Sequence, residues 1–133
     1  MHWYLLVLEA MLRLITARLT VTSFRFGRWR RRLGSMASGP LAVPAPSMRD
    51  RQLARAVERA SQRLPFEVKC LPRAMALHAM LRRRRRPSQL VIAALPGCAR
   101  GTLDDLHAWV EVGGEMLIGA PDRPFYPLVR FDG

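Results

Sequence analysis

Two residues of this chain have the types and surroundings that nucleophilic catalysis requires. Cys70 stands in the sequence KCLPRA at residues 69–74, and His107 opens the sequence HAWVE at residues 107–111. A thiol acts as a nucleophile when a base lies beside it and a further group orients that base. The sequence therefore supplies candidates for the nucleophile and the base, and it leaves the orienting group to be found.

Cys70 lies where a helix is expected to begin. Pro72 suits the first turn of a helix, because its missing N–H has no partner to lose there. The sequence AMALHAML at 74–81 favours a helix and repeats apolar side chains at helical spacing, so we predict a helix to about Arg84. The N–H groups and the positive dipole end at such a start stabilise an anion, which includes a thiolate or the oxyanion of a tetrahedral intermediate. Lys69 and Arg73 add positive charge on either side.

His107 begins a segment in which side chains alternate between two faces of an expected strand. His107, Trp109 and Glu111 share one face. The pair Gly113-Gly114 then predicts a tight hairpin turn, and residues 115–118 form the returning strand. A histidine at the entrance of a strand can face the end of a helix that packs on the sheet.

The other thiol and imidazole groups fit passive roles. Cys98 lies in the loop PGCARG, with no helix start nearby, and His78 lies two turns into the predicted helix, on a part that points away from Cys70. By themselves, Cys70 also fits a small buried apolar residue, and His107 fits a surface or hydrogen-bonded core histidine. The cysteines and histidines lack zinc-site spacing, so we expect no metal and no cofactor.

Length and composition indicate a globular protein with one core. The chain has 133 residues, of which 50% are hydrophobic, and three are tryptophan. Its formal net charge is +12, and every basic residue except Lys69 is arginine, so the surface should attract anionic partners. No nucleic-acid-binding signature accompanies the charge, which favours an acidic peptide or protein partner. Two cysteines in unlike contexts predict no disulfide framework, and a working thiol suits a reducing, cytoplasmic setting.

The N-terminal segment, residues 1–34, is expected to hold an amphipathic helix and a basic stretch. Residues 3–21 are largely apolar, but Glu9, Arg13 and Arg18 interrupt them, so we expect packing on the protein or a partner and no membrane span or signal peptide. Glu9 and Arg13 have the spacing of an i, i+4 ion pair. The arginines between residues 25 and 32 alternate with phenylalanine and tryptophan, which is compatible with peripheral membrane contact.

The rest of the chain is expected to form a linker, residues 35–47, and a core, residues 48–133. Proline, glycine and serine dominate the linker. Ser47 and Asp50 predict a capping box at the start of a helix that runs to about Leu64. A strand is expected at 89–95, and prolines are expected to make the tail after the hairpin irregular. Helices followed by antiparallel strands predict an α+β fold with the helices on one side of a small sheet.

Four short segments together resemble one known family, the transglutaminase-like leader peptidases of lasso-peptide biosynthesis; they are LPF at 64–66, CLPRA at 70–74, PS at 87–88 and HAWVEV at 107–112. These bacterial cysteine proteases remove the leader from a ribosomally made precursor, and a separate ATP-dependent cyclase closes the macrolactam ring. The resemblance implies a papain- or transglutaminase-like fold, with Cys70 as nucleophile and His107 as base. The family's usual glycine before the proline is Arg86 here, which should reshape that turn.

The resemblance does not supply the third catalytic residue directly. The family usually has an acid about a dozen positions after the histidine, and that position is Gly119 here. Neither a two-residue nor a three-residue hairpin loop places an acid opposite His107, although the longer loop makes Gly119 its same-face neighbour. Asp122 is therefore our candidate for the third residue, and Asp105 is the alternative.

The resulting expectation is a cysteine endopeptidase that cleaves one bond of a lasso-peptide precursor. Because the core leaves no room for a leader-binding domain of ~80 residues, we expect the stand-alone form, which works with a separate leader-recognition protein. The ATP-dependent cyclase is a further candidate partner. Three alternatives remain: a transglutaminase-type acyltransferase, a degenerate module that binds or escorts the precursor, and a basic protein held at membranes or nucleic acid.

Overall fold

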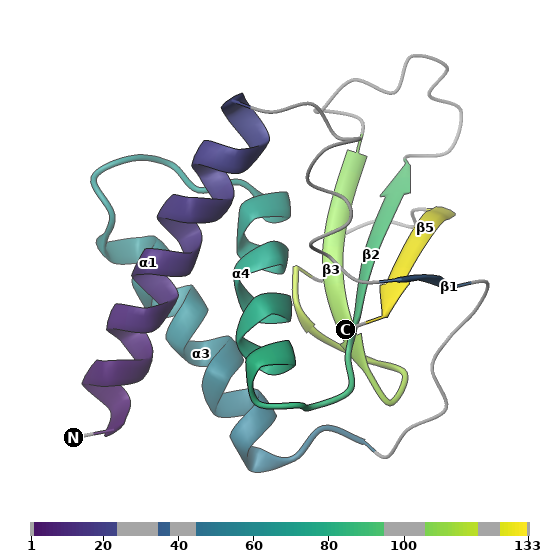
Figure 1. Cartoon of the computed structure of the whole chain (residues 1–133), viewed down its shortest axis with the longest axis horizontal. Coiled ribbons are helices and arrows are strands. Elements are labelled where there is room, and N and C mark those ends of the chain that lie inside the picture. The colour runs from purple at the N-terminus through teal and green to yellow at the C-terminus, as the bar shows by residue number, and fades with distance from the viewer. Residues whose placement is uncertain (1, 24–34, 38–44, 95–105, 120–125, 133) are drawn as a thin grey trace.

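The computed structural model describes residues 2–23, 35–37, 45–94, 106–119 and 126–132, so that Cys98, Asp105 and Asp122 lie outside the described residues. The elements are α1 (His2–Ser23), β1 (Ser35–Ala37), α3 (Met48–Arg63), α4 (Cys70–Arg83), β2 (Gln89–Ala94), β3 (Leu106–Val112), β4 (Glu115–Ile118) and β5 (Tyr126–Asp132). The helices lie on one side of the sheet (Figure 1). The predicted α+β class is confirmed.

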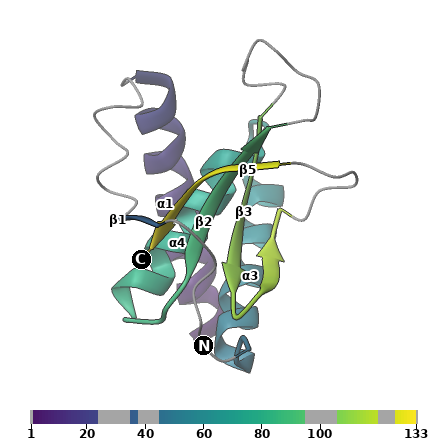
Figure 2. The same cartoon turned by 90° about the vertical axis from the view of Figure 1, so that its right-hand side faces the viewer.

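The strands form one antiparallel sheet in the order β1-β5-β2-β3-β4 (Figure 2). The tail that was expected to be irregular contains β5, which lies between β1 and β2. Pro127 is accommodated because the β2–β5 register shifts at this point, and a bulge tolerates a residue without an N–H. Residues 35–37, at the start of the expected linker, form β1 and pair with β5.

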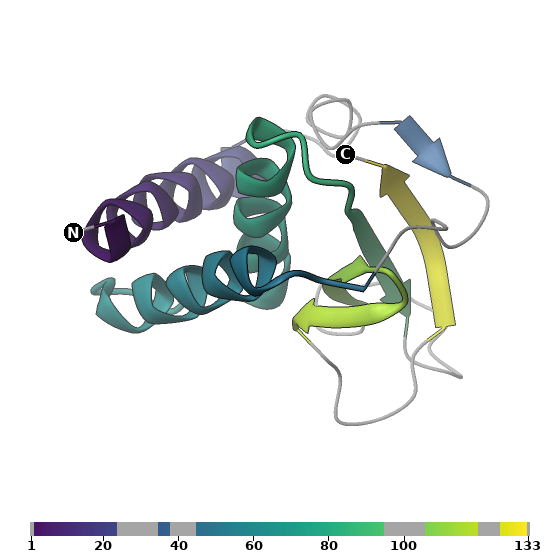
Figure 3. The same ribbon diagram turned by 90° about the horizontal axis from the view of Figure 1, so that it is seen from below.

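The helices form two layers on the sheet. Figure 3 shows α4 between the sheet and the outer pair α1 and α3, and α4 packs on both β2 and β3. The buried side of α1 contacts α3 and α4 through Leu6, Val7, Ala10, Leu14 and Ala17. The opposite side of α1 exposes Leu5, Leu8, Leu12 and Leu19 to solvent. Among the described helices, none has the length and hydropathy needed to cross a bilayer.

Glu9 connects α1 to the end of α4. Arg84 donates to both carboxylate oxygens of Glu9, at 2.9 and 2.8 Å, and Arg83 lies 3.2 Å from the same group. The hydrogen bond from Arg84 lowers the pKa of Glu9, against the opposing effect of burial. Glu9 therefore pairs with arginines at the end of α4 and not, as the sequence had predicted, with Arg13. Residue spacing within α1 could not have indicated these partners.

The start of α3 is the predicted capping box. The Asp50 N–H donates to Ser47 Oγ at 3.2 Å, and the Ser47 N–H donates to the Asp50 carboxylate at 2.9 Å. Arg86, from the connection after α4, also donates to Asp50 and to Ser47. Burial raises the pKa of Asp50, but the hydrogen bonds from Arg86 and the Ser47 N–H outweigh it and lower that pKa. Arg86 thus links the connection after α4 to the start of α3.

The end of α4 places a large side chain in a backbone conformation that favours glycine. The Arg86 N–H donates to the Leu81 carbonyl and the Arg85 N–H to the Arg82 carbonyl, both at 2.9 Å, which is the bonding pattern of a Schellman motif. Arg85 has a φ of 56°, in the left-handed region. Glycine usually takes this position because a Cβ is strained there.

We expect Arg85→Gly to stabilise the protein. Removing the Cβ relieves the left-handed strain, so the free energy of unfolding should rise by about 0.5–1 kcal/mol after the greater freedom of the unfolded chain is subtracted. The melting temperature, measured by circular dichroism, should rise by about 2–6 °C. The matched control is Arg82→Gly, within the helix, which should lower the free energy of unfolding by about 0.5 kcal/mol. A lower melting temperature in Arg85→Gly would contradict the strain argument.

Candidate active site

Cys70 is the first residue of α4, as the sequence predicted. Lys69 holds the N-cap position, and its side chain makes no capping hydrogen bond, in contrast to the closed capping box of α3. The thiol is half-buried at the edge of the core, and Cys70 is a free cysteine. A helix start without a capping side chain can offer its N–H groups to an anion.

The guanidinium of Arg73, in the first turn of α4, has partners of its own. Arg73 turns back along the chain, where its Nε donates to the Val68 carbonyl at 2.9 Å and its Nη1 lies 3.8 Å from the Glu58 carboxylate. The expectation that Arg73 simply adds positive charge beside the thiol is therefore modified, because its guanidinium already faces an acid.

His107 lies at the end of the sheet where α4 begins. The 14 residues of α4 rise about 21 Å, and the six residues of β2 return about 20 Å in the opposite direction after the short connection 84–88. His107 pairs with Ala93, next to the last residue of β2. The starts of α4 and β3 accordingly lie at the same end of the molecule (Figure 1).

The two side chains occupy different surfaces at this end. Ala108 and Val110 face the helices and belong to the main core. His107 and Trp109 lie together on the opposite face of β3, where the His107 ring is half-buried and its centroid lies 6.2 Å from that of Trp109. Among the described residues, no hydrogen bond joins the Cys70 thiol to His107. The fold thus brings the two elements together without bringing the two side chains into hydrogen-bond contact.

The hydrogen bond to His107 comes from Gly119, the residue at the position where the leader peptidases that this sequence resembles usually have an acid. His107 Nε2 meets the carbonyl oxygen of Gly119. The hairpin loop has the two predicted residues, Gly113 and Gly114, both with positive φ. Glu111 pairs with Met116, but the neighbouring Val110 pairs with Ile118 and not with Leu117, so the β3–β4 register shifts by one residue at a bulge. Beyond this bulge, β4 has the register that the sequence predicted for a three-residue loop, although the loop itself has two residues.

A comparison with profiles of protein families matches the transglutaminase-like superfamily over residues 11–130. The chain belongs to the transglutaminase-like superfamily. Members of this superfamily include cysteine peptidases and acyltransferases. Comparisons with curated proteins and with solved structures give no match. The superfamily match covers all of the described sheet except the last two residues of β5, and it includes both Cys70 and His107.

The tryptophan and the glutamate that follow His107 in this transglutaminase-like chain belong to a polar network across the sheet. Trp109 Nε1 donates to Glu111 at 2.6 Å, and Arg130 Nη1 lies 3.2 Å from both Glu111 and Gln89. Gln89 donates in turn to Asp132 at 2.7 Å. The network joins β3, β2 and β5 and braces the strand that carries His107. Sequence reasoning missed it because β5 was not expected.

His78 is a core residue. It is 1% exposed, and its Nδ1 lies 2.9 Å from the Ser88 hydroxyl. This hydrogen bond connects the second half of α4 to the segment before β2.

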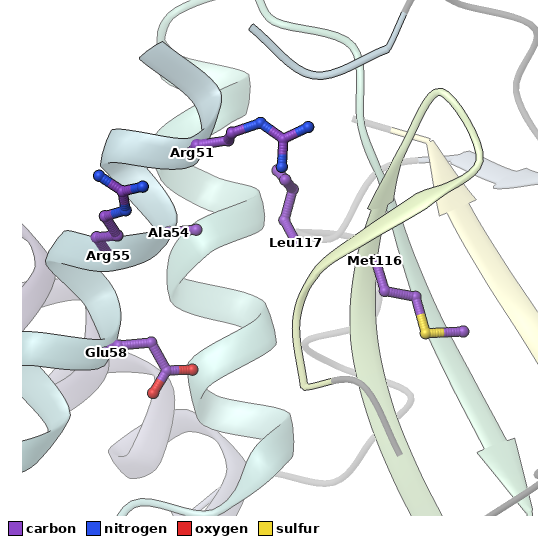
Figure 4. Close-up of a pocket in the computed structure, with 6 residues that line it drawn as sticks. All are labelled: Arg51, Ala54, Arg55, Glu58, Met116 and Leu117. Carbon is purple, nitrogen blue, oxygen red and sulfur yellow. The ribbon is translucent and has the colours of Figure 1, made fainter. Parts of the chain in front are cut away.

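A shallow pocket of about 190 Å³ lies between α3 and β4, lined by Arg51, Ala54, Arg55, Glu58, Met116 and Leu117 (Figure 4). Arg51, in the first turn of α3, forms an ion pair with Glu115. Glu115 pairs with Val112, at the end of β3 far from His107. The pocket also includes Glu58, whose carboxylate lies 3.8 Å from Arg73 Nη1 in the first turn of α4.

Proposed function

We propose that this transglutaminase-like protein is a cysteine peptidase that removes the leader peptide from a ribosomally made lasso-peptide precursor. The observation that carries the proposal is the position of Cys70 at the first turn of α4, where the N-cap residue makes no capping hydrogen bond, at the same end of the fold as His107. The short segments around both residues resemble leader peptidases, and the superfamily includes cysteine peptidases.

In the proposed reaction, His107 accepts the Cys70 proton and the thiolate attacks the scissile carbonyl. N–H groups of the first turn of α4 stabilise the oxyanion of the tetrahedral intermediate. Collapse of that intermediate breaks the C–N bond, His107 protonates the leaving amine, and an acyl-enzyme remains. Water then attacks the thioester, releasing the leader carboxylate and the thiol. The two side chains lie on different surfaces in this structure, so the proposed reaction requires them to approach each other when the precursor binds.

The proposal includes a separate leader-recognition protein with an acidic docking surface. Four arginines of α3, namely Arg51, Arg55, Arg59 and Arg63, are exposed at intervals of four residues, which places them along one side of the helix. Such a row concentrates positive charge, and attraction between it and an acidic surface would weaken as salt screens both.

The test is reconstitution from the reading frames beside this gene. The short precursor and the small leader-recognition protein encoded there are mixed with the full chain, and products are followed by mass spectrometry. We expect slow or absent cleavage by the chain alone and faster release of a leader with a free carboxylate when the second protein is added. Transfer of the leader to an added amine would instead support an acyltransferase. A precursor that is bound but never cleaved would support the escort alternative.

The docking surface has a matched pair of variants. Arg59→Glu and Arg49→Glu change the charge equally on the same helix, but Arg49 lies outside the arginine row. Arg59→Glu should weaken the acceleration by the leader-recognition protein, and high salt should weaken it in the same way. Equal effects of the two variants, or an acceleration that is insensitive to salt, would contradict docking through α3.

A further inference from the structure

We propose that the backbone carbonyl of Gly119 orients His107 for catalysis. The inference rests on the proposed function, since it assigns His107 as the base. Gly119 holds the sequence position at which the resembling family usually has its acid, and its carbonyl oxygen makes the hydrogen bond to His107 Nε2. Gly119 is thus a positioning residue that acts through the main chain.

The chemistry of this contact determines the form of the imidazole. A carbonyl oxygen can only accept a hydrogen bond, so His107 Nε2 must carry the proton. In the neutral ring the other nitrogen, Nδ1, then has the lone pair. Nδ1 is therefore the atom of His107 that can take a proton from the Cys70 thiol. A triad acid acts in the same way, by holding the imidazole in one tautomer and one orientation.

The local backbone explains why a carbonyl stands here and an acid does not. Gly119 has a φ of 79°, a conformation that side-chain-bearing residues rarely adopt. A Cβ at this position would lie 2.5 Å from the Ala108 carbonyl oxygen and 3.3 Å from the Trp109 Cα. An aspartate could not enter without moving one of the two strands. The same close approach to β3 brings the Gly119 carbonyl to the ring of His107.

The register of the hairpin fixes this carbonyl in place. The bulge after Met116 advances β4 by one residue relative to β3, so Gly119 follows directly after the pairing of Ile118 with Val110. A carbonyl held by a strand pairing has less freedom than a carboxylate on a side chain, and a fixed acceptor loses little entropy when it orients the ring.

The tautomer of His107 can be measured directly in the full chain without substrate. Ring nitrogens are labelled with ¹⁵N, and two-bond correlations to the ring protons are recorded at a pH where the imidazole is neutral. We expect His107 to show the Nε2–H tautomer. A predominant Nδ1–H tautomer, or an even mixture, would overturn the inference. Loss of the Nε2–H tautomer in Asp122→Asn would overturn it as well, because the acid would then be the orienting group.

Two glycine variants connect the tautomer to turnover. Gly119→Ala should abolish the tautomer preference and lower kcat about 10- to 100-fold with little change in KM, because the carbonyl must move. Gly114→Ala is the matched control: Gly114 has a φ of 83°, and a Cβ there meets nothing within 4 Å. It should keep both the tautomer and the rate. Equal behaviour of the two variants would overturn the inference.

This experiment separates the inference from the proposed function. An Nε2–H tautomer in a protein that never cleaves the precursor would leave Gly119 as the orienting group and would reject the peptidase. Cleavage that depends on His107, together with an Nδ1–H tautomer, would support the peptidase and reject Gly119. Where Gly119→Ala fails to fold, as judged by circular dichroism, the tautomer of the unaltered chain still decides.

Discussion

Cys70→Ala is expected to abolish leader removal, with the rate falling at least about 10⁴-fold, because no acyl-enzyme can form without the thiol. The fold should survive, since Cys70 is half-buried at the start of α4 and alanine suits a helix. Release of the free leader, followed by mass spectrometry in the reconstituted mixture, measures the rate. The melting temperature measured by circular dichroism should change by no more than a few degrees.

The other thiol provides the control for this result. Cys98→Ala should cleave the precursor at the normal rate, because the sequence places Cys98 in a loop away from any expected base. Iodoacetamide near neutral pH should modify Cys70 first, and peptide mapping locates the label. Equal loss of activity in the two variants would contradict the assignment of Cys70 as the single essential thiol.

His107→Ala is expected to lower kcat by about two to four orders of magnitude, the usual range for the loss of a general acid–base group. The substitution also removes the hydrogen bond to the Gly119 carbonyl. Because that bond lies at the edge of the fold beside a half-buried ring, binding of the precursor should change little. Steady-state kinetics with the leader-recognition protein present would separate kcat from KM.

The buried histidine of α4 is the matched control. His78→Ala should retain near-normal cleavage but lower the free energy of unfolding by about 1–3 kcal/mol, since it leaves a buried hydroxyl of Ser88 without its imidazole partner. Urea unfolding measures the loss. An essential His78 with a dispensable His107 would show that the base has been assigned to the wrong strand.

The sequence by itself determined the features that depend on neighbours within a few residues. Ser47 and Asp50 form a capping box, α4 begins at Cys70 before Pro72, and the hairpin turns at Gly113 and Gly114. Each is decided by contacts three or four positions apart, or by the backbone preferences of one residue type. The α+β class followed from the order of these local elements, and the superfamily match agrees with it.

The tertiary structure alone decided the features that depend on distant segments. The prolines of the tail indicated irregular chain, but β5 is stabilised by pairing with β1 and β2 on either side. Glu9 had an intrahelical partner available in Arg13, yet it binds Arg84, because α1 packs against α4 and brings an arginine to its partly buried carboxylate. Local propensity gives no information about which strand or helix becomes the neighbour.

The same division between local and tertiary information applies to the group that orients His107. Residue types identified Cys70 and His107 as a thiol and a base, and the resemblance to leader peptidases implied an acid at the position that Gly119 occupies. A sequence pattern describes side chains, whereas the hydrogen bond to His107 comes from a main-chain carbonyl. Only the bulge between β3 and β4 determines where that carbonyl lies, and a bulge is set by the packing of the two strands against the rest of the fold.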